Sequence, residues 1–98
     1  MMQQISFSEL QQLQQSQNIL LIDVREKNEH DAFNIGGLLI PLGEIISNTQ
    51  AIPKDIPVVV YCRKGIRSQI AIQRLEDKFG FTNLINLRGG IGDGNKEK

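Results

Sequence analysis

Short apolar runs separated by polar segments recur along the chain, and they predict its strands. Residues 19–24 and 58–61 are apolar almost throughout and lack the alternation of a half-exposed strand. Such runs are typical of strands covered on both faces, as in a parallel sheet. Residues 84–87 predict a third, shorter strand, and residues 39–40 and 4–5 predict two brief ones, the latter at an edge of the sheet.

The first polar segment predicts a short surface helix. Ser6 is followed three residues later by Glu9, the spacing of a capping box, in which each side chain satisfies a backbone N–H of the other residue. Leu10 and Leu13 supply the apolar positions of this glutamine-rich helix.

A longer helix is predicted over residues 68–79, where apolar side chains follow helical spacing, and Gly80 ends it in a left-handed conformation. Residues 26–33 and 44–46 predict two shorter helices. Alternating strands and helices predict an α/β fold with a mostly parallel central sheet flanked by helices on both faces.

Length and charge restrict the choice of function. The chain has 98 residues, 40% of them hydrophobic, with 11 basic and 11 acidic side chains and a formal net charge of 0. We expect one domain over residues 1–91 and a flexible C-terminal tail over residues 92–98. A neutral chain has no global field that attracts nucleic acid or anionic lipid, so neither is an expected partner. No signal peptide is evident at the start, and the apolar runs are far shorter than the ~20 residues that span a bilayer, so we expect a cytoplasmic protein.

The chain has a single cysteine, Cys62, and a single histidine, His30. This composition excludes an internal disulfide, a cysteine-based metal cluster and a histidine-rich metal site, so no metal is expected. Any cysteine chemistry must use Cys62 alone.

Cys62 begins a loop that joins a buried strand to the following helix, where sites form in open parallel sheets. The helix N-terminus and three nearby cations, Arg63, Lys64 and Arg67, lower a thiol's pKa and favour the thiolate. Gly65 allows the loop to curl so that successive N–H groups point at one spot, as in an anion cradle. Ser68 either caps the helix or donates its hydroxyl into the cradle. A cysteine in an unremarkable setting is more often a small buried hydrophobe, but these neighbours favour a reactive one.

Three stretches of this chain resemble the rhodanese-like domains, which are sulfurtransferases that carry sulfur as a cysteine persulfide. Residues 21–26, with Glu29, are similar to the aspartate-valine-arginine turn of that family. Residues 34–37 and 40–42 resemble its isoleucine-x-glycine and isoleucine-proline-leucine segments, and residues 60–68 resemble its active-site loop. The resemblance extends from Ile5 to Ile91.

The resemblance implies a two-step mechanism without a metal or organic cofactor. Cys62 takes the outer sulfur of a small anionic donor such as thiosulfate and passes it to cyanide in vitro, or to a thiol or protein acceptor in the cell. The backbone N–H groups of residues 63–67 stabilise the persulfide. Because there is no second cysteine, the sulfur must leave to an external acceptor. The substrate-binding residues implied are Arg63, Lys64, Gly65, Ile66, Arg67 and Ser68.

Some positions depart from the family pattern or carry a structural expectation. Asn34 stands where the family often has histidine, and the segment after Ile91 lacks the family's tryptophan. His30 is expected at the surface or in packing, because the persulfide mechanism needs no general base. Asp23 and Arg25 are expected to form a structural pair near the site.

Two other functions are compatible with a reactive cysteine in such a loop. Cysteine-dependent phosphatases and related arsenate reductases place arginine after cysteine and five intervening residues, whereas here only four separate Cys62 from Arg67. A non-catalytic protein-interaction module of the same family is the other alternative. Such modules typically lack the cysteine that this chain retains.

Overall fold

The computed structural model describes residues 2–92, and within them five strands form one sheet. All four neighbouring strand pairs are parallel, so the predicted α/β fold with a mostly parallel sheet is confirmed. In spatial order the strands are β1 (Gln3–Ile5), β5 (Leu84–Leu87), β4 (Val58–Tyr61), β2 (Leu20–Asp23) and β3 (Leu38–Leu39).

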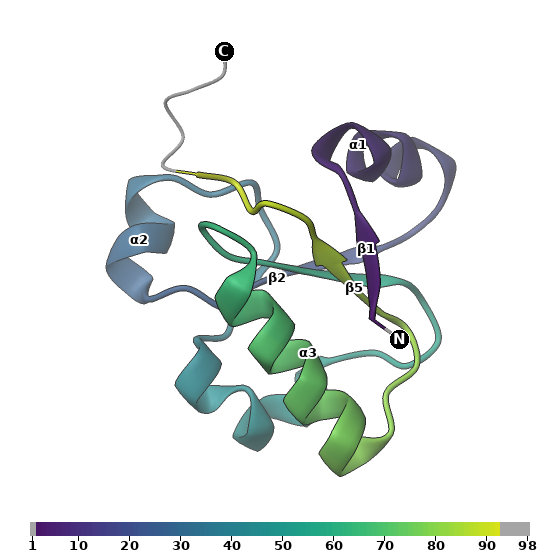
Figure 1. Ribbon diagram of the computed structural model, residues 1–98, viewed down its shortest axis with the longest axis vertical. Helices are drawn as coiled ribbons and strands as arrows, with labels where there is room; N and C mark the ends of the chain where they lie inside the picture. The colour runs from purple at the N-terminus through teal and green to yellow at the C-terminus, as the bar shows by residue number, and fades with distance from the viewer. Residues whose placement is uncertain (1, 93–98) are drawn as a thin grey trace.

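Helices cover both faces of this sheet, as the sequence predicts (Figure 1). On one face, Leu10 of α1 (Phe7–Ser16) packs with Leu21, Val59 and Ile85. On the other, the apolar side of α3 (Ile66–Phe79) packs with β2, β4 and two 3₁₀ helices, η1 (Leu42–Glu44) and η2 (Ile46–Ala51). A short helix, α2 (Lys27–Ala32), follows β2.

The central strand β4 is buried at all four positions, which explains its continuous apolar sequence. It pairs with β2 on one side and β5 on the other, and Asp23 lies opposite Tyr61 in the register. The carboxyl ends of β2 and β4 therefore lie side by side, and each is followed by a segment rich in charged residues.

Several boundaries differ from those predicted. The Ser6–Glu9 capping box is present at α1, but α3 begins at Ile66, two residues before the predicted start. The helix predicted over residues 44–46 is replaced by the two 3₁₀ helices. Within residues 2–92, no helix is long and apolar enough to cross a membrane. Most of the predicted tail, residues 93–98, lies outside the described residues.

Candidate active site

Cys62 lies directly after β4, on the loop that leads into α3, and its side chain is almost fully buried, with 1% exposed. Its sulfur accepts hydrogen bonds from the backbone N–H of Gly65 at 3.1 Å and of Ser68 at 3.4 Å. The hydroxyl oxygen of Ser68 lies 3.5 Å from the same sulfur. Backbone N–H groups of this loop therefore point at Sγ, and one of them, that of Ser68, lies beyond the predicted range of residues 63–67.

This setting favours the ionised form of Cys62. Burial raises the pKa of the thiol, but hydrogen bonds from the backbone N–H groups of Ser68, Gly65 and Lys64 lower it, and the net shift is downward. A thiolate held by N–H groups at a helix start is a nucleophile that needs no separate base.

Two glycines allow this loop to form. Gly65 is the N-cap of α3 with a φ of 90°, a left-handed conformation that L side chains rarely adopt. Ser68 is thus not the cap, which was one of its two predicted roles; it lies inside the first helical turn with its hydroxyl at Sγ. The turn after β5 supports the loop from the other side, because a Cβ on Gly90 would overlap the carbonyl oxygens of Cys62 and Arg63.

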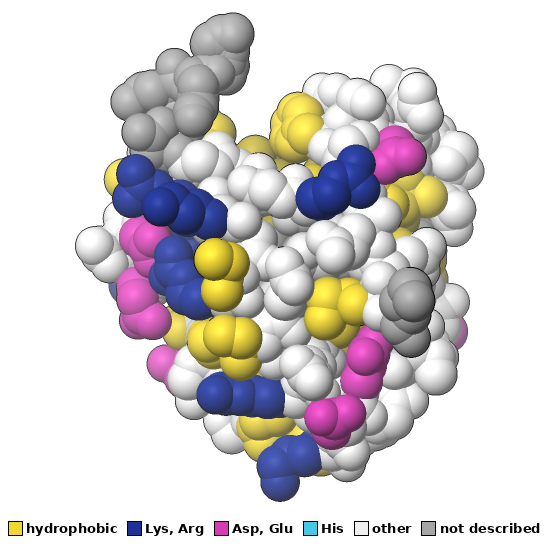
Figure 2. Space-filling model, viewed as in Figure 1, with side chains coloured by type: hydrophobic (Ala, Val, Ile, Leu, Met, Phe, Trp, Pro, Cys, Tyr) yellow, Lys and Arg dark blue, Asp and Glu magenta, His cyan; other side chains and the backbone are white. Residues whose placement is uncertain are grey.

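A pocket of about 320 Å³ opens over Cys62. Ile66 is 62% exposed beside it. On this side of the molecule, Lys and Arg side chains gather with acidic and hydrophobic ones around the start of α3 (Figure 2). The structure thus brings four of the six predicted substrate-binding residues to the pocket and places the other two, Gly65 and Ser68, at the sulfur. The residues that line the pocket are Glu29, Cys62, Arg63, Lys64, Ile66 and Arg67.

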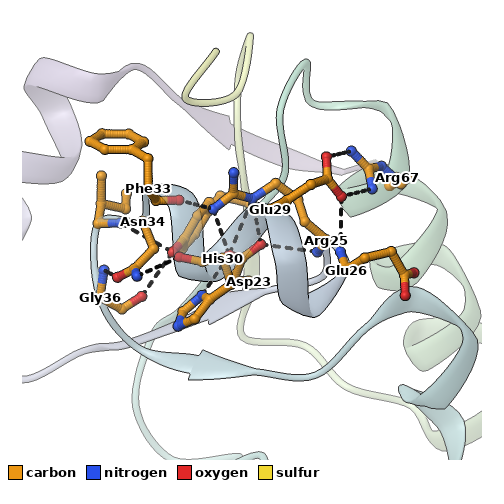
Figure 3. A network of polar contacts seen from close by, with 11 residues as sticks. Asp23, Arg25, Glu26, Glu29, His30, Phe33, Asn34, Gly36 and Arg67 are labelled. Atoms are coloured by element: carbon orange, nitrogen blue, oxygen red, sulfur yellow. Dashed lines mark hydrogen bonds and ion pairs between the residues drawn. The ribbon is translucent and has the colours of Figure 1, made fainter. Parts of the chain in front are cut away.

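Arg67 is held by a partner that the sequence analysis did not assign to the site. Its guanidinium donates two hydrogen bonds to the carboxylate of Glu29, at 2.8 and 2.9 Å (Figure 3). This contact lowers the pKa of Glu29 to about 2 and raises that of Arg67. Glu29 therefore offsets the charge of one of the three cations, Arg63, Lys64 and Arg67, predicted near Cys62.

Asp23 and Arg25 form a buried ion pair, as predicted, with 0% and 3% of their side chains exposed. The carboxylate of Asp23 also contacts Nδ1 of His30 at 2.8 Å, and Arg25 donates to the carbonyl oxygen of Phe33 (Figure 3). None of these three side chains lines the pocket over Cys62. The pair therefore ties the end of β2 to α2, which supports its structural interpretation.

Asn86 is a second residue that the sequence analysis missed. It is fully buried in β5, and its side chain accepts a hydrogen bond from the Ser68 hydroxyl. The available signal was a single polar residue within the apolar run of residues 84–87. A buried amide in such a run needs partners, and here one of them is a residue of the Cys62 site.

Comparison with known proteins identifies the family. A model of the rhodanese-like domain matches residues 6–97. The chain belongs to the rhodanese-like domain family. Solved structures agree: the human single-domain sulfurtransferase TSTD1 is 31% identical, with a TM-score of 0.75 over 89% of each chain.

Curated relatives of this rhodanese-like domain include proteins of different lengths. A protein of Allochromatium vinosum named sulfurtransferase is 39% identical over 82 residues, which is 83% of this chain and 76% of that protein. The uncharacterized protein YqhL of Bacillus subtilis is 44% identical over 72 residues, or 72% of this chain. The match covers only 56% of YqhL, and only 22% of Drosophila proteins named adenylyltransferase and sulfurtransferase MOCS3.

Proposed function

We propose that this protein is a sulfurtransferase that carries sulfane sulfur as a persulfide on Cys62. The family and its sulfurtransferase-named relatives support a transferase in general. One observation carries the finer assignment: the only cysteine of the chain lies under an open pocket, with its sulfur in a cradle of backbone N–H groups.

In the first step, the thiolate of Cys62 attacks the outer sulfur of thiosulfate. An S–S bond to Sγ forms as the S–S bond of the donor breaks, and its electron pair leaves with sulfite. The negative charge of the thiolate passes to the outer sulfur of the persulfide. N–H groups already fixed at this spot stabilise that anion without reorganisation.

In the second step, a thiophilic acceptor attacks the outer sulfur and Cys62 leaves as a thiolate. With cyanide the product is thiocyanate. Because the chain has no second cysteine, no internal disulfide can release the sulfur, and the acceptor is an external thiol, a protein or cyanide. A reactive free thiol persists best where thiols are kept reduced, and on that ground we propose a cytoplasmic location.

The pocket suits a small anionic donor. Arg63 and Lys64 line the pocket and attract a dianion. The opposite charges of Glu29 and Arg67 cancel each other. Gly65, Ile66 and Ser68 complete the set of proposed substrate-contacting residues. The depth of Cys62 requires that the donor or an extended acceptor group enters the pocket to reach Sγ.

A mass measurement tests the sulfurtransferase proposal, and two further assays distinguish a phosphatase from a protein-interaction module. Purified protein and its Cys62→Ser variant are incubated with thiosulfate, and their intact masses are recorded. We expect the wild-type protein alone to gain one sulfur atom, which cyanide or a reductant then removes. No gain from thiosulfate or from small persulfides would overturn the proposal. Hydrolysis of phosphate esters would then indicate a phosphatase, and a specific protein complex without either activity would indicate an interaction module.

A further inference from the structure

Ser68 lies between the sulfur of Cys62 and the amide of Asn86, and all three side chains are buried. A serine hydroxyl has one proton to donate and two lone pairs. It can therefore donate to the sulfur or to Asn86, but not to both at once. The direction of this hydrogen bond decides whether Ser68 stabilises a thiolate or a thiol.

The orientation of the Asn86 amide settles that direction. Its Nδ2 lies 3.5 Å from the carbonyl oxygen of Gly65 and 3.0 Å from Oε1 of Gln4. The Gly65 carbonyl can only accept, so the amide nitrogen must face it and the amide oxygen must face Ser68. That oxygen can only accept, so the Ser68 proton points to Asn86.

We propose that Asn86 is a positioning residue that holds the Ser68 hydroxyl proton and thereby withholds it from Sγ of Cys62. In this arrangement Ser68 presents a lone pair to the sulfur. A thiol S–H can donate to it, whereas a thiolate would face it unfavourably. Turning the hydroxyl toward a thiolate would leave the buried Asn86 oxygen without a partner, which is costly.

The Ser68–Asn86 hydrogen bond has a consequence for sulfur loading, and this step rests on the proposed function. Once a persulfide forms, the Sγ that the Ser68 hydroxyl faces is uncharged, and the negative charge lies on the outer sulfur. The Ser68–Asn86 pair therefore opposes charge on Sγ in the empty enzyme and leaves the loaded enzyme unaffected. It favours the sulfur-loaded state over the free thiolate.

Ionisation of Cys62 tests this directly, because the thiolate absorbs in the ultraviolet and the chain has one cysteine. The test variant is Asn86→Leu, which keeps the side-chain shape but removes the acceptor, and Cys62→Ser supplies the background. The charged groups that face the pocket are Glu29 of α2, Arg63 and Lys64 of the loop and Arg67 of α3. They are the same in every variant, so differences report on the Ser68–Asn86 pair.

We expect Asn86→Leu to increase the ionisation constant of the thiol roughly tenfold, because the freed hydroxyl donates to the thiolate. In a Ser68→Ala background, Asn86→Leu should leave the ionisation constant of the thiol unchanged. No increase with Ser68 present, or an equal increase in both backgrounds, would overturn the proposal, since a merely structural role does not depend on the hydroxyl.

Ser68→Ala alone gives a second test that does not require Asn86→Leu to fold. If the hydroxyl proton belongs to Asn86, removing the hydroxyl leaves the ionisation constant unchanged or raises it. A tenfold decrease would show that Ser68 donates to the thiolate, and the proposal would be wrong. Sulfur loading is scored separately by mass, so failure of the proposed function does not alter the outcome of the titration.

Discussion

Glu29 and Arg67, 38 positions apart in the chain, meet in a two-bond ion pair at the rim of the Cys62 pocket. Glu29 comes from α2 and Arg67 from the first turn of α3, so the pair joins the segments that follow β2 and β4. It fixes the guanidinium beside the pocket and adds a negative charge where an anionic donor enters. The pairing of these two opposite charges at the pocket leads to two predictions.

Glu29→Gln should lower the KM for thiosulfate. Removing one negative charge several ångströms from a dianion is worth roughly 1 kcal/mol in a water-exposed setting, so we expect a decrease of about three- to tenfold at low salt. The effect should shrink as salt is added. Asp31→Asn is the matched control, because it removes the same charge from α2 at an exposed ion pair with Lys27. An unchanged or higher KM for Glu29→Gln would contradict the prediction.

The Glu29–Arg67 ion pair should also make the free energy of unfolding depend on pH in the acidic range. In the folded protein, the contact with Arg67 lowers the pKa of Glu29 from 4.5 to about 2. The ionised carboxylate therefore stabilises the fold at and above pH 4.5, and this contribution is lost as the pH falls through 2. Urea denaturation over this range should show the stability advantage of wild type over Glu29→Gln shrinking toward zero. A difference that stays constant between these two pH values would show that the ion pair is not its source.

Much of the fold follows from local sequence. The apolar runs at β2, β4 and β5 and the Ser6–Glu9 capping box are local patterns, and each gives the predicted element. The loop from Cys62 to Ser68 is also contiguous, so its position between a strand and a helix could be predicted.

What could not be predicted depends on contacts between distant segments. Glu29 lies in a polar helix with no local sign that its carboxylate meets Arg67, and Asn86 meets Ser68 only because β5 pairs beside β4. The start of α3 differs from the predicted one for a different reason. Ser68 is a good cap by residue type, but Gly65 adopts the left-handed conformation and the helix begins directly after it.

The buried pair of Asp23 and Arg25 should dominate the stability of the segment after β2. Asp23→Asn leaves a buried guanidinium without its carboxylate, which typically costs about 3–5 kcal/mol. Asp31→Asn breaks an ion pair with Lys27 whose side chains are 58% and 78% exposed, and should cost less than about 1 kcal/mol. Urea denaturation at neutral pH compares the two. Similar small losses would show that Arg25 finds another partner or reaches water.

Two glycines with nearly the same backbone conformation test how closely the C-terminal turn supports the Cys62 loop. Gly80 and Gly90 have φ values of 69° and 68°, but only a Cβ on Gly90 would meet other atoms, the backbone of Cys62 and Arg63. Gly80→Ala should therefore cost only the left-handed strain, about 1 kcal/mol. Gly90→Ala adds a steric overlap and should cost roughly 3 kcal/mol. It should also slow sulfur loading at least tenfold, because the loop that positions Sγ must shift. Urea denaturation and the rate of mass gain from thiosulfate measure the two effects. If Gly90→Ala matched Gly80→Ala in both, the turn would not be what holds the loop in place.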